Sequence, residues 1–313
     1  MNTTHGLIAL GACCLLALGS GCGQPPLQLH FPEGLERSYE VSEQKEMEMT
    51  MPVINQGMRQ TERTNSTVRV AVADPGAEGA GTMRIVFDDL TVGMSMSFMG
   101  ESMTLEGEDS PMGALTEAVI GEEFRVTVEP NGNIVGFEGF DELMDKVLDS
   151  IGLGAITQGE MGMMMEEMWS ADQQRMSIQK SIFPHLPMTP VETGDTWTVT
   201  YTVTDPMPMQ IEDTYTVLNV YEDRVTIDVA SILTPHPTES SIDMGGGFSM
   251  NMEVNGDGEG FLEVDRETGW LNEASTTLRI RGEAEFVGMP VDVPGGMDKI
   301  PMTARVQFDS RAI

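Results

Sequence analysis

Residues 82–98 read TMRIVFDDLTVGMSMSF, and this stretch decides the class of fold. Met94, Met96 and Phe98 alternate with Ser95 and Ser97, and the part before them is rich in β-branched and other apolar residues. A period of two places alternate side chains on opposite faces of a β-strand. The stretch therefore predicts a long strand with one apolar face.

The same signals recur along most of the chain, separated by turns that contain Gly, Pro, Asn or Asp. The other expected strands are Arg37–Met51, Thr64–Ala73, Glu123–Glu129, Thr196–Thr204, Glu212–Tyr221, Arg224–Leu233, Ser249–Val254, Gly260–Asp265, Trp270–Arg281 and Thr303–Asp309. A series of this kind predicts a mostly antiparallel β protein.

Two parts of the chain share a spacing pattern. The segment 121–124 (GEEF) is followed eight residues after its Phe by Gly132, and the segment 258–261 (GEGF) is followed at the same distance by Gly269. This pattern indicates two halves of similar topology, about Leu27–Gly139 and Val191–Ile313. Chance is the alternative, because a strand, a turn with Gly and a second strand are a common combination.

The clearest helical pattern lies between these halves. Apolar residues follow the helical period from Phe140 to Ile151, and acids occupy the first turn, where the helix dipole favours them. A second helix is expected from about Met161 to Ile182. A shorter one is expected at Pro111–Ile120, with Ser110 as its N-cap.

We therefore expect an α+β fold with one or two curved antiparallel sheets that are built from two similar halves. The central amphipathic helix pair is expected to lie on the concave side. Two β-sandwich-like lobes joined by a helical linker are the alternative. The expected division is a signal peptide at 1–21, a lipidated Cys22 with a tether at 22–30, a β-rich half at 31–139, a helical segment at 140–183 and a second β-rich half at 184–313.

The N-terminal segment predicts export and a lipid anchor. All three cysteines lie within the first 22 residues. The apolar run Leu7–Leu18 is shorter than the roughly 20 residues that span a bilayer, and small residues follow it up to Cys22. We expect cleavage before Cys22 and a lipid on its sulfur, which attaches the protein to a bacterial membrane. A non-lipidated secretory peptide and a cytoplasmic protein are the alternatives, because no Lys or Arg precedes Arg37.

The composition limits the kinds of partner. The 50 acidic residues outnumber the 17 basic ones and give a net charge of −33, which repels nucleic acid. The 27 Met residues suggest either packing or Cu(I) binding. Their period-two spacing and the scarcity of His favour packing. Residues 255–260 (NGDGEG) match the start of a calcium loop, but position twelve is Arg266 instead of Glu. We expect no metal and no cofactor.

Motifs of the common enzyme classes are missing. The chain contains no H-E-x-x-H, G-x-S-x-G or P-loop sequence, and no Cys follows Cys22. With so many acids, no single carboxylate pair has a special claim to glycoside hydrolysis. We therefore expect a protein that is not an enzyme, and we assign no catalytic residue.

Several motifs together carry a resemblance. These are the exported Cys22, the strand from Gly121 to Asn131-Gly132, the central helix, Leu186-Pro187 with Val191-x-x-Gly194-Asp195-x-Trp197, and Val264-Asp265 with Thr268-Gly269. With these motifs the chain resembles an uncharacterised family of bacterial lipoproteins. The resemblance implies a fold and a place in the cell envelope, but no site. The layout is also similar to the lipoprotein-carrier fold, whose members hold acyl chains in an apolar groove.

Two functions follow as expectations. The first is a lipid-anchored envelope protein, in the periplasm or at the cell surface, that binds a hydrophobic small molecule. The candidate lining residues, which ordinary core packing would also explain, are Met94, Met96, Phe98, Met161, Met164, Met165, Met168 and Trp169. The second is a structural or assembly role through contacts with other envelope proteins.

Overall fold

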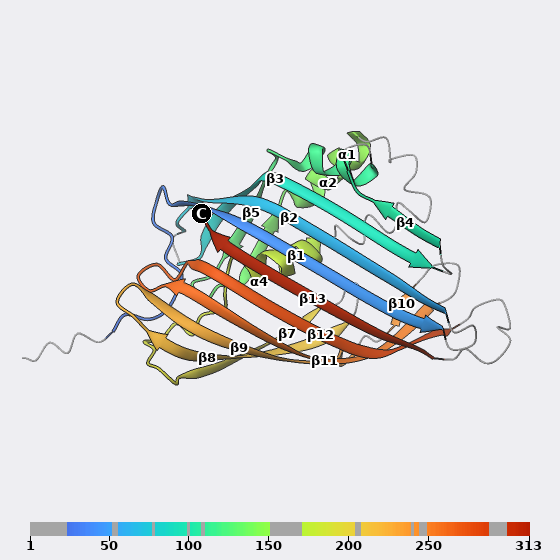
Figure 1. Cartoon of the computed structure of the whole chain (residues 1–313). Coiled ribbons are helices and arrows are strands. Elements are labelled where there is room, and N and C mark those ends of the chain that lie inside the picture. The colour runs from blue at the N-terminus through green and yellow to red at the C-terminus, as the bar shows by residue number, and fades with distance from the viewer. Residues whose placement is uncertain are drawn as a thin grey trace, which may run out of the picture.

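A single antiparallel sheet of thirteen strands forms the body of the protein (Figure 1). The structure is a computed structural model that describes residues 24–51, 56–76, 79–98, 101–107, 110–150, 171–203, 208–238, 241–243, 249–287 and 299–313. The strands follow the order β6-β5-β3-β2-β1-β13-β12-β11-β9-β8-β7, with β4 beside β3 and β10 beside β11. The sheet is open and curved. The expected curved antiparallel sheet is therefore confirmed, and of the two numbers left open, one or two, the described strands form one.

The strands fall into two groups that meet at one seam. The first group is β1 (Glu36–Met51), β2 (Gln56–Asp74), β3 (Gly81–Phe98), β4 (Glu101–Leu105), β5 (Glu123–Val128) and β6 (Ile134–Glu138). The second is β7 (Thr196–Val203), β8 (Met209–Val220), β9 (Arg224–Pro235), β10 (Ser241–Asp243), β11 (Ser249–Asp265), β12 (Leu271–Val287) and β13 (Ile300–Ala312). The seam is the pairing of β1 with β13, which runs from Tyr39 opposite Ala312 to Met49 opposite Met302.

The period-two pattern separates an apolar concave face from a charged convex face. On β12, Ala274, Leu278 and Ile280 are buried on the concave side. Arg279, on the convex side between them, forms ion pairs with Asp257 and Glu259 of β11. Both groups of strands alternate in this way, which explains how a strongly acidic chain keeps buried apolar clusters on its concave side.

Three helices lie in the described part of the chain, and they are few beside the strands. They are α1 (Pro111–Val119), α2 (Phe140–Ser150) and α4 (Ala171–Ser181). Ser110 caps α1 as expected, because its Oγ accepts a hydrogen bond of 3.1 Å from the Gly113 N–H. None of these helices has the length and apolar character that crossing a membrane requires.

The helices cover the concave face. Phe140, Leu143 and Met144 of α2 are buried in the same core as Val126 of β5. Helix α4 crosses the inner side of the sheet near the seam and contacts β13 and β6 (Figure 1). Residues 151–170, which include most of the second expected helix, lie outside the described residues.

One expected turn is instead the middle of a strand. Strand β11 is continuous from Ser249 to Asp265, so two predicted strands and the candidate calcium loop between them are one element. Gly256, Gly258 and Gly260 leave the concave side of this segment without side chains, which is why its sequence imitates a loop. A Cβ at Gly256 would overlap the backbone of Arg279 in β12. Glycine therefore permits the close approach of the two strands at this point of the curved sheet.

The two ends of the sheet, the Leu27 end and the Met49 end, differ. At the Leu27 end, where β1 begins and β13 ends, Leu27 and Leu29 are buried before the first strand starts. Trp270 is fully buried there, and its Nε1 donates a hydrogen bond of 2.8 Å to the His30 carbonyl. At the Met49 end, β1 reaches Met51 and β3 reaches Phe98.

Replacing Gly256 tests the role of close strand approach. Gly256→Ala is expected to lower the free energy of unfolding by about 1–3 kcal/mol, because a rigid backbone atom occupies the space of the new Cβ. Gly57→Ala in β2 is the matched control, since its added Cβ makes an ordinary contact of 3.4 Å with the Met49 carbonyl oxygen. Urea unfolding curves of both variants measure the difference, and equal midpoints would contradict this account.

Candidate functional site

The concave face has three zones along the strands. The largest apolar core lies toward the Leu27 end and includes Tyr39, Trp270 and Phe183. A second apolar cluster lies toward the Met49 end and includes Met252, Met302 and Ile280. Between them the inward positions of several strands are polar, and α4 packs over this polar zone. The candidate site consists of the polar zone and the methionine-rich surface next to it.

Asp213 is the centre of the polar zone. It lies on the inward face of β8 and is completely buried. Lys180 of α4 donates a hydrogen bond of 2.5 Å from Nζ to Oδ2, and Ser231 of β9 donates one of 2.6 Å from Oγ to Oδ1. The Tyr201 and Tyr215 hydroxyls donate to Oδ2 at 3.1 and 3.4 Å. Four donors from four elements therefore converge on one carboxylate.

The electrostatics of this group favour the ion pair. Burial alone raises the pKa of Asp213, but the Lys180 charge and the hydrogen bonds outweigh burial and hold that pKa below its ordinary value. Burial and the negative charge of Asp213 raise the pKa values of Tyr201 and Tyr215 well above the ordinary range. These tyrosines therefore remain neutral donors at physiological pH.

His185 borders the same group in its neutral form. Its ring centroid lies 6.1 Å from that of Tyr201, and its carbonyl accepts a hydrogen bond of 3.2 Å from Trp197 Nε1. Burial, and then the nearby Lys180 charge, lower the pKa of His185 to about 4. His185 is therefore uncharged at neutral pH.

A second polar group lies on the other side of the seam. Lys45 Nζ is 3.1 Å from Glu43 Oε1 on β1 and 3.4 Å from Glu62 Oε1 on β2. Ser177 of α4 donates a hydrogen bond of 3.3 Å to Glu43 Oε2. Burial raises the pKa of Glu43. Burial alone lowers the pKa of Lys45, but the two carboxylates outweigh it and raise that pKa to about 12.

Helix α4 is therefore held to both groups of strands. Lys180 reaches β8 and Ser177 reaches β1. Gln179 accepts a hydrogen bond of 3.2 Å from the Ile134 N–H and donates one of 2.8 Å to the Gly132 carbonyl, in the turn between β5 and β6. These contacts fix α4 across the seam by directional bonds as well as by burial of Ile178.

Beyond this polar zone, the concave face toward the Met49 end is lined largely by methionine. Pairing registers place Met47, Gln60, Met96 and Met103 opposite one another across β1, β2, β3 and β4. The next inward position on each of the first three strands is Met49, Met58 and Phe98. Met47, Met49, Met58 and Met96 are half-buried, and Met103 is exposed. We call Met47, Met49, Met58, Met96 and Met103 the methionine surface.

The predicted site residues are distributed as follows. Met94 is buried beside Glu62, and Met96 belongs to the methionine surface. Phe98 takes the same face by register. Met161, Met164, Met165, Met168, Trp169 and Cys22 lie outside the described residues. Among the residues that are described, no cluster of three or more His, Cys, Asp or Glu is placed to hold a metal ion.

Sequence reasoning missed the polar zone, although a signal was present. In β8 the inward positions are Met209, Ile211, Asp213, Tyr215 and Val217, so one carboxylate interrupts an apolar series. In β1, Glu43 and Lys45 interrupt the series between Val41 and Met47 in the same way. Charged residues at inward positions of a strand indicate buried partners on another element.

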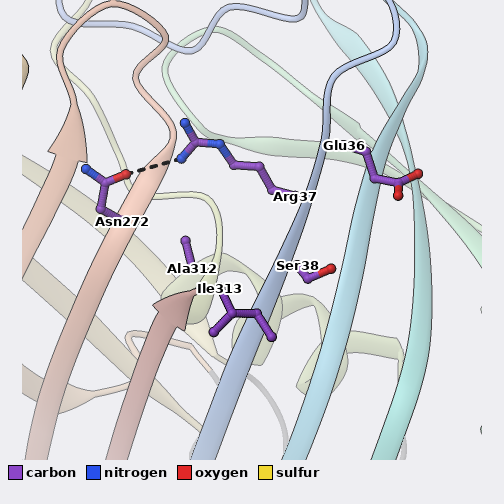
Figure 2. A pocket seen from close by; sticks show the side chains of 6 residues that line it. All are labelled: Glu36, Arg37, Ser38, Asn272, Ala312 and Ile313. Carbon is purple, nitrogen blue, oxygen red and sulfur yellow. Dashed lines mark hydrogen bonds between the residues drawn. The ribbon is translucent and has the colours of Figure 1, made fainter.

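A separate hollow lies at the Leu27 end, between the start of β1, the start of β12 and the end of β13 (Figure 2). It has a volume of about 400 Å³ and is lined by Glu36, Arg37, Ser38, Asn272, Ala312 and Ile313. Arg37 donates hydrogen bonds of 3.2 Å to the Leu271 carbonyl and 3.3 Å to Asn272 Oδ1. Its guanidinium is thus held by the protein itself, and we assign this hollow no ligand.

The Lys180–Asp213 pair provides a sharp test of how α4 is held. Lys180→Met is expected to lower the free energy of unfolding by about 3–5 kcal/mol, because it leaves a fully buried carboxylate without its counter-charge. Lys146→Met is the matched control, since Lys146 forms an ion pair of the same 2.5 Å length with Glu122 but is 66 % exposed. That variant is expected to lose less than about 1 kcal/mol. Equal losses in urea unfolding would contradict the buried role.

His185 makes a distinct contribution to stability in acid. Its pKa is 6.5 in an unfolded chain and about 4 in the folded protein, so between these values only the unfolded chain binds the proton. Stability therefore falls as the pH drops from 6.5 to 4, by up to about 3 kcal/mol. His185→Phe is expected to flatten this part of the curve, and His30→Phe, at an exposed position, is not. Urea midpoints at a series of pH values measure both slopes.

The chain has distant structural similarity to some solved structures. A search of curated proteins gave no match. Among solved structures, a lipovitellin structure described by its lipid–protein interactions is similar with a TM-score of 0.44 and 10 % identity, over 89 % of this chain. The chain spans only 25 % of the length of that protein. The Pseudomonas aeruginosa protein OpdQ gives a TM-score of 0.14 and 6 % identity, over 88 % of this chain and 98 % of its own length.

The family comparison is more informative. A family described as a family of unknown function (DUF6263) matches residues 78–271, which is more than half of the chain. The match runs from the turn before β3 to the start of β12, and it includes Lys180, His185, Tyr201 and Asp213. The chain therefore belongs to the family of unknown function DUF6263.

Proposed function

We propose that this protein is a lipid-anchored protein of the cell envelope that binds a hydrophobic small molecule on its concave face. The observation that carries the proposal is the methionine surface: inward side chains of β1, β2, β3 and β4 that are apolar yet half-buried or exposed. On the same strands β2 and β3, inward apolar positions nearer the Leu27 end, Val70 and Ile85, are fully buried. The contrast supports a binding role for the methionine surface.

Methionine suits such a surface for a physical reason. Its side chain is unbranched and polarisable, so it adapts to ligands of different shape without a rigid pocket. The polar zone beneath α4 closes the methionine surface on the side toward the Leu27 end.

We propose a binding role instead of a catalytic one because the buried polar groups already satisfy one another. Both oxygens of Asp213 accept hydrogen bonds from protein donors. Lys45 lies between two carboxylates. A general acid or base needs access to a substrate proton, and these groups are instead bound to their own neighbours.

The lipid anchor at Cys22 belongs to the same proposal. It is supported by the short apolar run and the small residues before Cys22. The proposed attachment is to a bacterial membrane, with the folded body in the periplasm or at the cell surface.

We also propose that the two groups of strands are copies of one unit. Each group forms a meander, β1-β2-β3-β5-β6 in the first and β7-β8-β9-β11-β12 in the second. Each has a short additional strand, β4 or β10. Phe124 and Phe261 of the two Gly-x-x-Phe segments lie in corresponding strands, β5 and β11, although Phe124 faces the concave side and Phe261 the convex side. This correspondence supports a duplication that includes the whole sheet except β13.

Native mass spectrometry of residues 23–313, purified from a bacterial host without denaturation, tests the binding role. We expect extra mass that organic extraction removes. Met49→Asn is expected to lower the bound fraction, because a polar amide on the methionine surface disfavours apolar contact. Glu48→Asn, the neighbouring change on the convex face, is the matched control and is expected to leave it unchanged.

The other outcomes have distinct meanings. A bare polypeptide mass in the wild-type protein would overturn the binding role and favour the structural or assembly role. Equal ligand occupancy in both variants would place the ligand elsewhere in the molecule.

A further inference from the structure

We propose that the Leu27 end of the sheet faces the membrane and that the methionine surface lies at the far end of the body, away from the bilayer that holds the anchor. The occupant of the surface at the Leu27 end is then the lipid bilayer. The ligand of the methionine surface would enter from the surrounding compartment and not from that bilayer. This inference rests on the proposed lipidation of Cys22.

Only a short length of chain connects the anchor to the folded body. Four residues lie between Cys22 and Leu27, so the chain makes five steps from one Cα to the other. A fully extended chain covers at most about 3.5 Å per residue, so the anchor lies within roughly 18 Å of Leu27. Leu27 is only 2 % exposed, which makes it part of the packed body and not part of a flexible tether.

The chain is firmly fixed to the folded body at Leu27. The Leu27 N–H donates a hydrogen bond of 2.9 Å to the Thr189 carbonyl, and its own carbonyl accepts one of 3.1 Å from Met188. The Leu29 N–H donates to the Pro130 carbonyl at 2.7 Å. The chain is thus joined to two separate loops within three residues, so pulling on the anchor orients the whole body.

Met188 adds a local feature beside this point of attachment. It is the one residue other than glycine with a positive φ, 58°, in the described part of the chain. Its side chain is 45 % exposed. The left-handed conformation costs a residue with a Cβ about 1–2 kcal/mol. The hydrogen bond to Leu27 holds Met188 in it, and an apolar side chain is thereby kept at the surface next to the anchor.

The methionine surface lies far from the Leu27 end along the strands. Met47 and Met49 lie 11 and 13 residues after Glu36, the first residue of β1. At about 3.3 Å per residue, they are roughly 36 and 43 Å from the Leu27 end. With that end at the bilayer, the methionine surface stands well beyond the headgroups.

The charge of the convex face disfavours its contact with the bilayer. The convex face carries Glu46 and Glu48 on β1 and many other acids, and the whole chain has a net charge of −33. Anionic headgroups repel such a face over a Debye length of about 8 Å at physiological ionic strength. The convex side is therefore disfavoured from lying on the bilayer, and the anchor, not surface charge, holds the Leu27 end there.

Depth-dependent fluorescence quenching tests the orientation. A lipidated Cys22 has no free thiol, and no other cysteine follows it, so one added cysteine gives one labelled position. The full chain would carry Thr193→Cys at the Leu27 end, Val287→Cys at the end of β12 or Met103→Cys on the methionine surface. Each labelled protein would be reconstituted in phosphatidylethanolamine–phosphatidylglycerol vesicles that contain a lipid with a spin-labelled headgroup.

We expect strong loss of fluorescence at position 193 and no loss at positions 287 and 103. Loss at 103 equal to that at 193 would overturn the inference, because the concave face would then lie on the bilayer. Loss at 287 but not at 193 would reverse the orientation and also overturn it. Co-flotation of the wild-type chain with vesicles, abolished by Cys22→Ser, tests the anchor separately. Failure of that control would refute the proposed anchor, and with it the basis of the orientation.

Discussion

The buried Lys180–Asp213 ion pair is the interaction on which the concave face depends. An open antiparallel sheet must cover one face, and α4 does this near the seam although only three of its eleven residues, Ala171, Met176 and Ile178, are apolar. So polar a helix buries little apolar area, and directional bonds therefore have to fix it. Asp213 accepts four donors in a region of low dielectric, where removal of one partner leaves a charge that water cannot reach. The same contact joins α4 to the second group of strands, while Ser177 joins it to the first.

The curvature of the sheet and the polar zone together divide the concave face. Glycines at positions 256 and 258 allow β11 to approach its neighbours more closely than a side chain would permit. The core at the Leu27 end is closed by aromatic residues such as Trp270 and Phe183, whose rings meet edge to face at 5.9 Å. Toward the Met49 end, Met96 and its neighbours remain partly accessible. A rigid, hydrogen-bonded boundary thus separates a packed interior from an adaptable surface.

Much of the secondary structure was predictable. In a sheet with one solvated face, polar and apolar residues alternate along each strand, and this alternation is visible in the sequence. The expected strands 37–51 and 82–98 differ from β1 and β3 by one residue at one end. Strand β11 was misjudged because three alternate glycines erased its inward apolar pattern. At the candidate site, Met94 and Met96 were correctly assigned to one face. The Asp213 group was missed, because Lys180 lies 33 residues away on a different element. Two residues that are buried together but lie far apart in the sequence leave no local sequence pattern.

The sequence by itself determined the antiparallel β class, the faces of most strands, the cap of α1 and the position of α2, because each depends on neighbouring residues and local periodicity. Only the tertiary structure decided that β1 pairs with β13 and so makes one sheet, since strand pairing depends on register between segments at opposite ends of the chain. It also decided which inward polar residues meet under α4. Burial and charge pairing are properties of three-dimensional contacts, and residues such as Lys180 and Asp213 acquire their roles only when the sheet brings them together.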